Sequence, residues 1–268
     1  MTIKALILNT TLRRSPSRSQ TQGLIDKAVA GYQKEGIETE VIRVIDHDIE
    51  QEYWDDFDDW NAGEKARRKD EWPWLLGKIK AADILVIATP ITLNMCTSAA
   101  HVILEKLNLM DELNADTGQF PLYNKVAGLL MCGNEDGAHH VAGTVLNNLG
   151  RLGYIVPPNS AAYWLGPAGT GPGYIEAHGD KHFHTNKLIR FMVSNTAQMA
   201  RILDATPLTT NLADCAAEAR AESSEVFAIR VNVDTPAIRY KRFQNLGDVP
   251  LTESVLAADE ESTPTKTA

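Results

Sequence analysis

Arginine and hydroxyl side chains crowd a short loop near the N-terminus, between an apolar run over residues 3–8 and a helical pattern that begins at Gln20. The N-terminus of a helix offers unpaired N–H groups and the positive end of the helix dipole, and both favour anions. Arginine adds donors whose geometry suits a terminal phosphate. The loop therefore predicts a phosphate-bearing ligand. Its polar side chains are Thr10, Thr11, Arg13, Arg14, Ser15, Ser17, Arg18 and Ser19.

This loop lacks the features of several known phosphate sites. It has neither the glycines and lysine of a Walker loop nor the G-x-G-x-x-G pattern of a Rossmann turn. No cysteine precedes the arginine and no aspartate ends the strand, which argues against a cysteine phosphatase and against aspartyl-phosphate chemistry. Hydroxyl groups in place of glycines suit a monophosphate. A surface loop with ordinary helix-capping serine and threonine is the alternative.

Polar loops also follow two further apolar runs. Residues 89–98 contain a turn at Pro90 and end in hydroxyl residues that can cap a helix. Residues 131–140 contain Gly133 and Gly137, which suit a loop that needs positive φ or a close backbone approach. If all three loops follow parallel strands, they lie at one edge of a sheet and form a composite site.

The elements that must position these loops alternate along the chain. The predicted strands are Ile3–Leu8, Glu38–Val44, Ile84–Ala88, Val126–Cys132 and Ser160–Trp164, and the predicted helices are Gln20–Lys34, Glu71–Ala81, Thr97–Leu113, Val141–Leu152 and Lys181–Leu203. Three strands are continuously apolar, as in a sheet covered on both faces. The alternation predicts an α/β fold, a doubly wound, five-stranded parallel sheet of flavodoxin-like type with helices on both faces, plus a C-terminal extension.

Composition narrows the class of protein. The 268 residues include 26 basic and 35 acidic side chains, and the net charge of −9 argues against a nucleic-acid or anionic-membrane partner. Cys96, Cys132 and Cys215 are odd in number and far apart, so we expect neither a disulfide framework nor a cysteine-based zinc site. The first strand begins at once with no signal peptide before it, and no run reads as membrane-spanning. These features predict a cytoplasmic protein.

Three motifs together resemble one family. Residues 9–21, Asn-Thr-Thr-Leu-Arg-Arg-Ser-Pro-Ser-Arg-Ser-Gln-Thr, are similar to the FMN-phosphate loop of NAD(P)H-dependent FMN reductases and related flavodoxin-family oxidoreductases. Residues 89–94, Thr-Pro-Ile-Thr-Leu-Asn, and 133–140, Gly-Asn-Glu-Asp-Gly-Ala-His-His, are similar to the family's two loops against the flavin ring. The segment 163–166, Tyr-Trp-Leu-Gly, also fits. The resemblance covers residues 2–203 and implies a flavodoxin-like FMN-binding domain over 1–204.

The resemblance implies a role for each loop. The implied phosphate ligands are Thr11, Arg13, Ser17, Ser19 and Gln20; the residues along the ring are Thr89, Pro90, Ile91, Thr92, Leu93, Asn94, Met95 and Cys96; and the residues near its pyrimidine side are Gly133, Asn134, Glu135, Asp136, Gly137 and His140. Thr92 stands where the family often has an aromatic residue, and Asn94 where glycine is frequent. These departures imply a ring that is more exposed, or one that a partner subunit covers. No catalytic side chain is implied, because FMN itself performs the redox chemistry.

The implied activity is that of an FMN-dependent NAD(P)H oxidoreductase. NAD(P)H passes a hydride to the flavin, which then reduces a small acceptor such as a quinone, a nitro or azo compound, or free flavin. An electron-transfer flavodoxin without direct NAD(P)H activity is the main alternative, and a non-flavin module on the same fold is another. A phosphate-handling hydrolase is disfavoured, because no nucleophile–base pair is apparent. The resemblance also implies a homodimer or homotetramer.

Two segments exceed the minimal fold. The acidic and aromatic insertion over residues 46–70 is expected to be a surface excursion, or else a lid. Residues 205–268 are expected to form a C-terminal extension or arm that contributes oligomer contacts, with a partly disordered tail. The histidines at 178, 182 and 184 have spacing compatible with a metal, but we expect a polar loop or helix start and no metal site.

Overall fold

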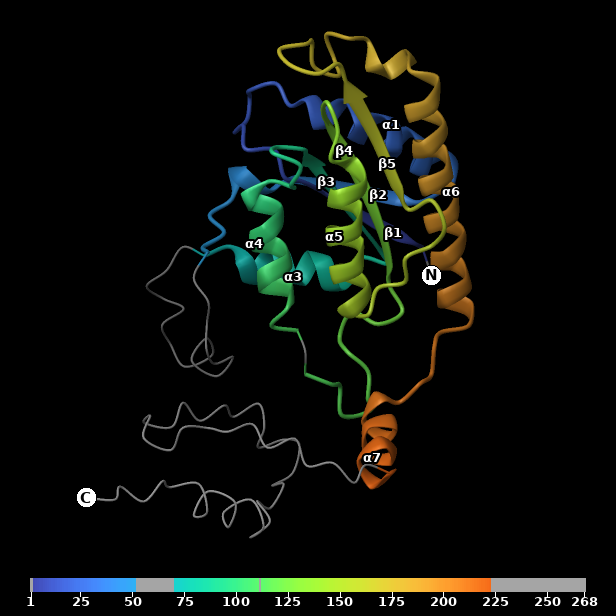
Figure 1. Ribbon diagram of the computed structural model, residues 1–268. Coiled ribbons are helices and arrows are strands. Elements are labelled where there is room, and N and C mark those ends of the chain that lie inside the picture. Colours follow the sequence, from blue (N-terminus) through green and yellow to red (C-terminus); the bar gives the residue numbers. More distant parts are fainter. Residues whose placement is uncertain (1, 52–69, 111, 223–268) are drawn as a thin grey trace, which may run out of the picture. The chain divides into compact units, whose positions relative to one another are not determined.

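The computed structural model describes residues 2–51, 70–110 and 112–222. Five strands form one sheet in the order β2-β1-β3-β4-β5, and every neighbouring pair is parallel (Figure 1). The strands are β1 (Lys4–Asn9), β2 (Glu38–Arg43), β3 (Ile84–Pro90), β4 (Val126–Asn134) and β5 (Ala161–Gly166). This order and the helices on both faces confirm the predicted doubly wound, flavodoxin-like α/β fold.

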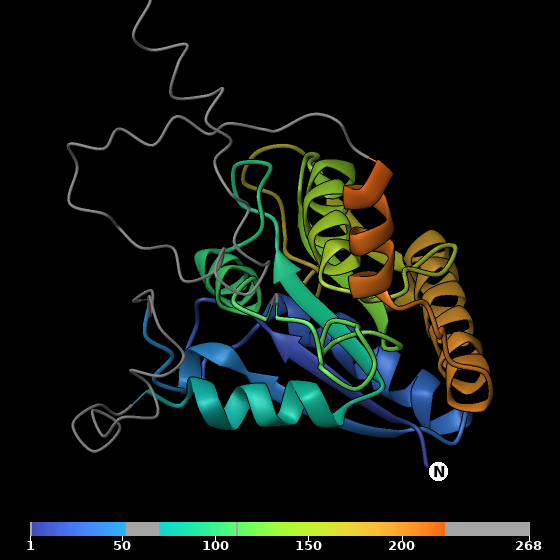
Figure 2. The ribbon, with the colours of Figure 1, turned by 90° about the horizontal axis from the view of Figure 1, so that it is seen from below.

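Helices cover the sheet on its two faces, as Figures 1 and 2 show. One face carries α1 (Gln20–Lys34) and α6 (Phe183–Ala205), whose apolar side chains join one buried cluster with the strands. The other face carries α3 (Trp72–Ala81), α4 (Ser98–Leu107) and α5 (Ala138–Arg151), which join a second cluster. Short 3-10 turns lie at Val44–Asp46 and Gly179–Lys181, and α7 (Leu212–Glu222) follows α6.

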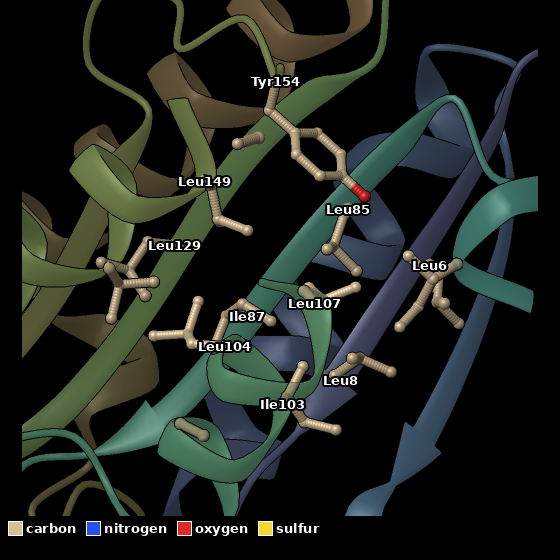
Figure 3. Packing of buried hydrophobic residues seen from close by; sticks show 14 of the residues in the cluster. Leu6, Leu8, Leu85, Ile87, Ile103, Leu104, Leu107, Leu129, Leu149 and Tyr154 are labelled. Carbon is tan, nitrogen blue, oxygen red and sulfur yellow. The ribbon is translucent and has the colours of Figure 1, made fainter. Parts of the chain in front are cut away.

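The central strands are apolar throughout because both of their faces are buried. Leu8 pairs in register with Ile87, and Ile87 with Leu129, so that three fully buried side chains lie side by side across β1, β3 and β4. Ile103 and Leu104 of α4 pack over this row (Figure 3). β2 has mixed burial, since it is an edge strand. The rigid core therefore fixes where each strand ends and where the loops begin.

The predicted element bounds differ from the observed ones mainly at the loops. β3 and β4 each run two residues further than predicted, and α5 begins at Ala138, three residues earlier. The predicted helix over residues 97–113 was too long, because α4 ends at Leu107 with Asn108 as its cap. Apolar periodicity continues to Leu109 and Met110, and those residues pack as a turn after the helix ends.

The chain divides by contacts into a unit of Met1–Cys215 and a unit of Ala216–Ala268. Within the first unit, the segment after α6 is tied to the loop before β4: the side-chain amide of Gln119 donates to the carbonyls of Leu208 (2.8 Å) and Thr210 (3.0 Å). The predicted division at residue 204 stays a prediction. The β-like run over 226–233 and the polar tail lie outside the described residues, as does most of the insertion, 52–69.

The two described ends of the insertion are anchored. Lys106 of α4 and Asp70 form an ion pair of 3.2 Å whose side chains are almost fully buried. Asp70 also accepts the backbone N–H groups of Glu50 (3.2 Å) and Trp72 (2.9 Å). No helix in the described part of the chain is long and apolar enough to cross a membrane.

We expect Ile103→Ala to lower the free energy of unfolding by about 2–5 kcal/mol, because it removes fully buried volume between α4 and the sheet. Ile202→Ala on α6 is the matched control: its side chain is 47% exposed, and we expect a change of about 0.5 kcal/mol or less. Urea unfolding followed by circular dichroism measures both. Equal losses in the two variants would contradict this account of the core.

Candidate functional site

Three buried threonines, which we call the threonine hub (Thr10, Thr89 and Thr97), join the loops at the carboxyl ends of β1 and β3. Thr97 donates its hydroxyl to the carbonyl of Thr10 at 2.7 Å and its backbone N–H to the hydroxyl of Thr89 at 3.1 Å. Thr10 in turn donates its N–H (2.8 Å) and its hydroxyl (3.0 Å) to the carbonyl of Ala88. Each hub residue is at most 4% exposed, so these bonds hold the first two predicted loops together in a dry environment.

The β1–α1 loop is shaped from within by Asn9, which is fully buried. Its amide donates to Gln22 (3.0 Å) and Ser19 (3.4 Å), and its carbonyl oxygen accepts the N–H of Thr11 (3.1 Å). Ser19 is the N-cap of α1, since its hydroxyl accepts the N–H of Gln22. The sequence pointed to the capping role, whereas Asn9 was not among the predicted site residues.

The same loop presents backbone donors that are free to bind an anion. Within the described part of the chain, the N–H groups of residues 12–14 and 18–21 have no acceptor. They stand at the positive end of α1, beside the exposed side chain of Arg13. A phosphate monoester needs this kind of donor set, and the residues therefore fit the flavin phosphate that the resemblance implies.

Gln20, a predicted phosphate ligand, has its side chain committed elsewhere. Its Nε2 donates to Glu176 (2.8 Å) and its Oε1 accepts the N–H of Ile175 (2.8 Å), so it bridges α1 to the β5–α6 loop. Arg18 reaches the same carboxylate at 3.0 Å. A hydrogen bond from its own backbone N–H, followed by the bonds from Gln20 and Arg18, holds the pKa of the Glu176 carboxyl below its usual range. Only the backbone N–H of Gln20 is free for the predicted role.

The outer side of the loop is held from the end of β2, which sequence reasoning did not include in the site. Asp46 accepts both the N–H (2.8 Å) and the hydroxyl (2.6 Å) of Ser15. Arg43 donates to the carbonyls of Ser17 (3.0 Å) and Arg13 (3.4 Å). The bonds from Ser15, together with the charges of Arg43 and Arg14, hold the pKa of the Asp46 carboxyl below its usual range.

The β3–α4 loop makes a tight reversal at the predicted ring position. Thr92 and Met95 exchange backbone hydrogen bonds of 2.9 Å each, with Leu93 and Asn94 between them at φ of 50° and 61°. Asparagine tolerates this left-handed region better than other residues with a side chain, which explains why asparagine can replace the glycine that is frequent here. Leu93 is 92% exposed in the same strained region, and such strain is typical of ligand loops.

The β4–α5 loop packs closely against this reversal. Gly137 has a φ of 89°, and a Cβ there would lie 2.8 Å from the Cα of Asn94. A Cβ on Gly133 would lie 2.8 Å from the Cβ of Ile91. Both glycines are therefore required by close approach, and the second and third predicted loops form one continuous wall.

Two predicted pyrimidine-side residues use their side chains to brace the β5–α6 loop. Asn134 donates to the carbonyl of Gly169 (3.4 Å), and Glu135 accepts the N–H of Gly169 (3.0 Å). The backbone N–H of Glu135 is also committed, since it donates to the carbonyl of Gly166 at 3.1 Å, so Glu135 offers no free backbone donor for the predicted role. His140 lies in the first turn of α5 and is exposed, because α5 begins at Ala138.

Two cavities each include some of the predicted residues in their lining. One, of about 620 Å³, lies beside the start of α1 and is lined by Ser17, Ser19, Arg43 and Tyr174 among others. The other, of about 410 Å³, is lined by Asn94, Gly137, His140 and Tyr163 among others. The larger cavity does not touch the two ring loops, and we attach the ring to the smaller one because both of those loops contribute to it.

Among the described residues, the two buried cysteines and the histidines at the start of α6 show no catalytic arrangement. Burial raises the pKa of the Cys96 thiol, and burial raises the pKa of Cys132 to about 11, so neither is an activated thiolate. His182 caps α6 through Thr185, and His184 lies edge-on to Tyr163. In residues 2–51, 70–110 and 112–222, no three His, Cys, Asp or Glu side chains are grouped to hold a metal ion.

Residues 3–165 match the model of one protein family, described as NADPH-dependent FMN reductase. The chain belongs to this family. It is a family of FMN-dependent oxidoreductases, and the predicted family, fold, enzyme class and FMN cofactor with NAD(P)H as co-substrate are thereby confirmed. The individual site residues stay predictions.

Two of the comparisons find a similarity well above what family membership requires. The chain is 84% identical over 256 residues, 96% of its length, to the whole of an 8-demethyl-8-aminoriboflavin-5'-phosphate synthase from Streptomyces davaonensis. It is 85% identical to a crystal structure of RosB with the bound intermediate 8-demethyl-8-formylriboflavin-5'-phosphate, which covers 92% of this chain and 98% of that one with a TM-score of 0.79.

A third structure, an apo NADH:FMN oxidoreductase, is 19% identical and has a TM-score of 0.51 over 78% of this chain and 94% of its own. At this identity the likeness shows the fold alone.

We expect Gly137→Ala to lower the free energy of unfolding by about 1–3 kcal/mol and to weaken flavin binding, because its Cβ would push Asn94 and strain a positive φ. Gly143→Ala in α5 is the matched control, since a Cβ there meets nothing within 4 Å. Its removal of a helical glycine should stabilise the protein by about 0.5–1 kcal/mol. Thermal unfolding and flavin titration measure both. If Gly137→Ala behaves like Gly143→Ala, the two loops do not form a close wall.

Proposed function

We propose that this chain takes riboflavin 5'-phosphate as a substrate and converts it to 8-demethyl-8-aminoriboflavin 5'-phosphate by way of the 8-formyl compound. The observation that carries this proposal is identity of 84% over 96% of the chain and the whole length of a synthase with that name. The 8-formyl intermediate bound in the RosB structure supports the same order of events.

The chemistry defines what the protein must supply. Oxidation of an aromatic methyl to a formyl group removes four electrons and adds one oxygen atom, so an electron acceptor is a co-reactant. In the second step the bond from C8 to the formyl carbon breaks and a C8–N bond forms, so an amino donor supplies the nitrogen. The carbon leaves as formaldehyde in a redox-neutral exchange, or as formate or CO2 if the same electron acceptor takes two or four further electrons. Neither step uses the phosphate, which serves as a handle: the N-terminus of α1, Arg13 and the free backbone N–H groups hold it and thereby fix the flavin.

The protein's own groups then orient the flavin ring. The reversal at Leu93 and Asn94 and the wall at Gly137 give a rigid surface of backbone against which a planar ring can lie. Backbone N–H groups near the ring's polar edge stabilise negative charge that develops on it.

A second candidate function is the one that the resemblance implies: hydride transfer from NAD(P)H to bound FMN, and then to an acceptor such as a quinone, a nitro or azo compound, or free flavin. The family match favours it. The two functions differ in whether the flavin is consumed. An electron-transfer flavodoxin lacking both activities is disfavoured by the identity to a synthase.

The predicted homodimer or homotetramer belongs to this proposal. Its support is the exposed apolar side chains near the ligand loops, Leu12 (53%), Leu93 (92%) and Met95 (48%), which a partner subunit would cover. The predicted cytoplasmic location is likewise part of the proposal, and its support is that Cys96, Cys132 and Cys215 are all free thiols.

The decisive experiment is to incubate the purified protein with riboflavin 5'-phosphate in air, with a mixture of amino acids as nitrogen source, and to separate the flavins by chromatography with mass detection. The proposal predicts the formyl and then the amino flavin phosphate. A parallel anaerobic reaction with NADPH or NADH measures bleaching of the flavin. Bleaching with no change at position 8 would contradict the proposal and favour the second function.

We expect Arg13→Ala to weaken binding of riboflavin 5'-phosphate by about 1.5–3 kcal/mol, the cost of a lost hydrogen bond to a charged group. Arg190→Ala on the exposed face of α6 is a control for the loss of one positive charge. Quenching of flavin fluorescence measures both affinities. Unchanged affinity for Arg13→Ala would remove that residue from the phosphate site.

A further inference from the structure

We propose that Asp46 is a positioning residue, which together with Arg43 holds the β1–α1 loop in the shape that binds the flavin phosphate. The inference rests on the proposed function, because it concerns the phosphate handle of that substrate. Both residues lie at the end of β2, outside the three loops that carry the resemblance.

Asp46 binds the middle of the β1–α1 loop through two hydrogen bonds. It accepts the backbone N–H of Ser15 at 2.8 Å and the Ser15 hydroxyl at 2.6 Å, so both carboxylate oxygens are used on one residue 31 positions away in the chain. Bonds to an ionised acceptor are shorter and stronger than neutral ones. A loop tip that would otherwise lose its backbone order is thereby tied to the sheet.

Arg43 fixes the orientation of two peptide groups of the same loop by hydrogen bonds to their carbonyls. Its Nη1 donates to the carbonyls of Ser17 (3.0 Å) and Arg13 (3.4 Å). In a planar trans peptide the C=O and the following N–H point in opposite directions. The N–H groups of Arg14 and Arg18 therefore point away from Arg43, and within the described residues neither has an acceptor. Arg43 thus aims donors for an anion without using its own charge on that anion.

The scaffold beneath these two residues is rigid. Arg43 pairs in register with Asn9, at the point where β1 ends and the loop begins. Val44, the next residue, is 3% exposed and packs in the core, which anchors the 3-10 turn that carries Asp46. A fixed support of this kind is what a positioning residue needs.

Because Asp46 is negatively charged, the two possible roles predict opposite changes in phosphate affinity when that charge is removed. A carboxylate beside an anion site repels the anion, so neutralising it should strengthen phosphate binding if charge alone matters. If Asp46 positions the loop, neutralising it should weaken binding instead. The positive side chains around Asp46, Arg43 and Arg14, offset its repulsion in the native protein.

The test compares Asp46→Asn with Asp48→Asn. Asp48 is an exposed carboxylate two residues away whose side chain makes no hydrogen bond in the described part of the chain, so its variant changes the same charge without touching the loop. Dissociation constants for riboflavin 5'-phosphate and for riboflavin, which lacks the phosphate, are measured by fluorescence quenching. We expect Asp46→Asn to weaken binding of the phosphate ester about tenfold, equivalent to about 1.4 kcal/mol, and to leave riboflavin binding unchanged.

Ser15→Ala provides the second variant, because it removes the other partner and no charge. It should also weaken binding of the phosphate ester, and the double variant should be no weaker than Asp46→Asn alone, as expected for residues that act through each other. Asp48→Asn should stay within about twofold of the native protein.

Three outcomes would overturn the inference. The first is unchanged or tighter binding of the phosphate ester by Asp46→Asn, with native discrimination between the two flavins; the proposed function would then stand. The second is equal weakening of both flavins, which would show general damage. The third is a native protein that binds both flavins equally, and then the phosphate handle of the proposed function falls as well.

Discussion

The hydrogen bond from the Thr97 hydroxyl to the carbonyl of Thr10 is the interaction on which the candidate site depends. It joins the end of β1 to the start of α4 where both residues are buried, so its loss would leave the Thr10 carbonyl without this donor in a site that is shielded from water. Through Thr89 and Ala88 the same network reaches the end of β3. Because the strands are parallel, their carboxyl ends meet at one edge, and the threonine hub keeps the loops at that edge in fixed relation.

Around this hub, each loop is further braced from outside the site. Asn9 shapes the β1–α1 loop from within, and Glu176 reaches α1 from the β5–α6 loop. Asn134 and Glu135 fasten that same β5–α6 loop to the end of β4. As a result the start of α1 presents the N–H groups of residues 12–14 and 18–21, which have no acceptor among the described residues, together with arginine and hydroxyl side chains. A surface of this kind suits a flavin phosphate. Asp136, His139 and His140 are titratable side chains that line the smaller cavity.

Local patterns were enough to predict the sheet, the first helix and the three loops. Ser19 and Gln20 mark the start of α1 in sequence as they do in the structure, because capping is a contact over three residues. Contacts between distant segments leave no such pattern. Ser15 donates to Asp46 across 31 positions of the chain, and this contact was not predicted. Gln20 donates to Glu176 across 156 positions, so the side chain of a predicted phosphate ligand is used for a contact within the protein instead. The early end of α4 was missed because apolar periodicity continues into the turn that follows.

The family match and the 84% identity to a synthase point to two activities on the same fold. The family holds FMN and reduces it, whereas the synthase is named for a product in which the flavin itself is changed. In our proposal both functions use a phosphate held at the start of α1 and a ring held against the second and third loops. A crystal structure with riboflavin 5'-phosphate tests this shared claim most directly. The account predicts phosphate oxygens within hydrogen-bonding distance of the free N–H groups of residues 18–21, with the ring against Asn94 and Gly137. A phosphate bound anywhere else would contradict it.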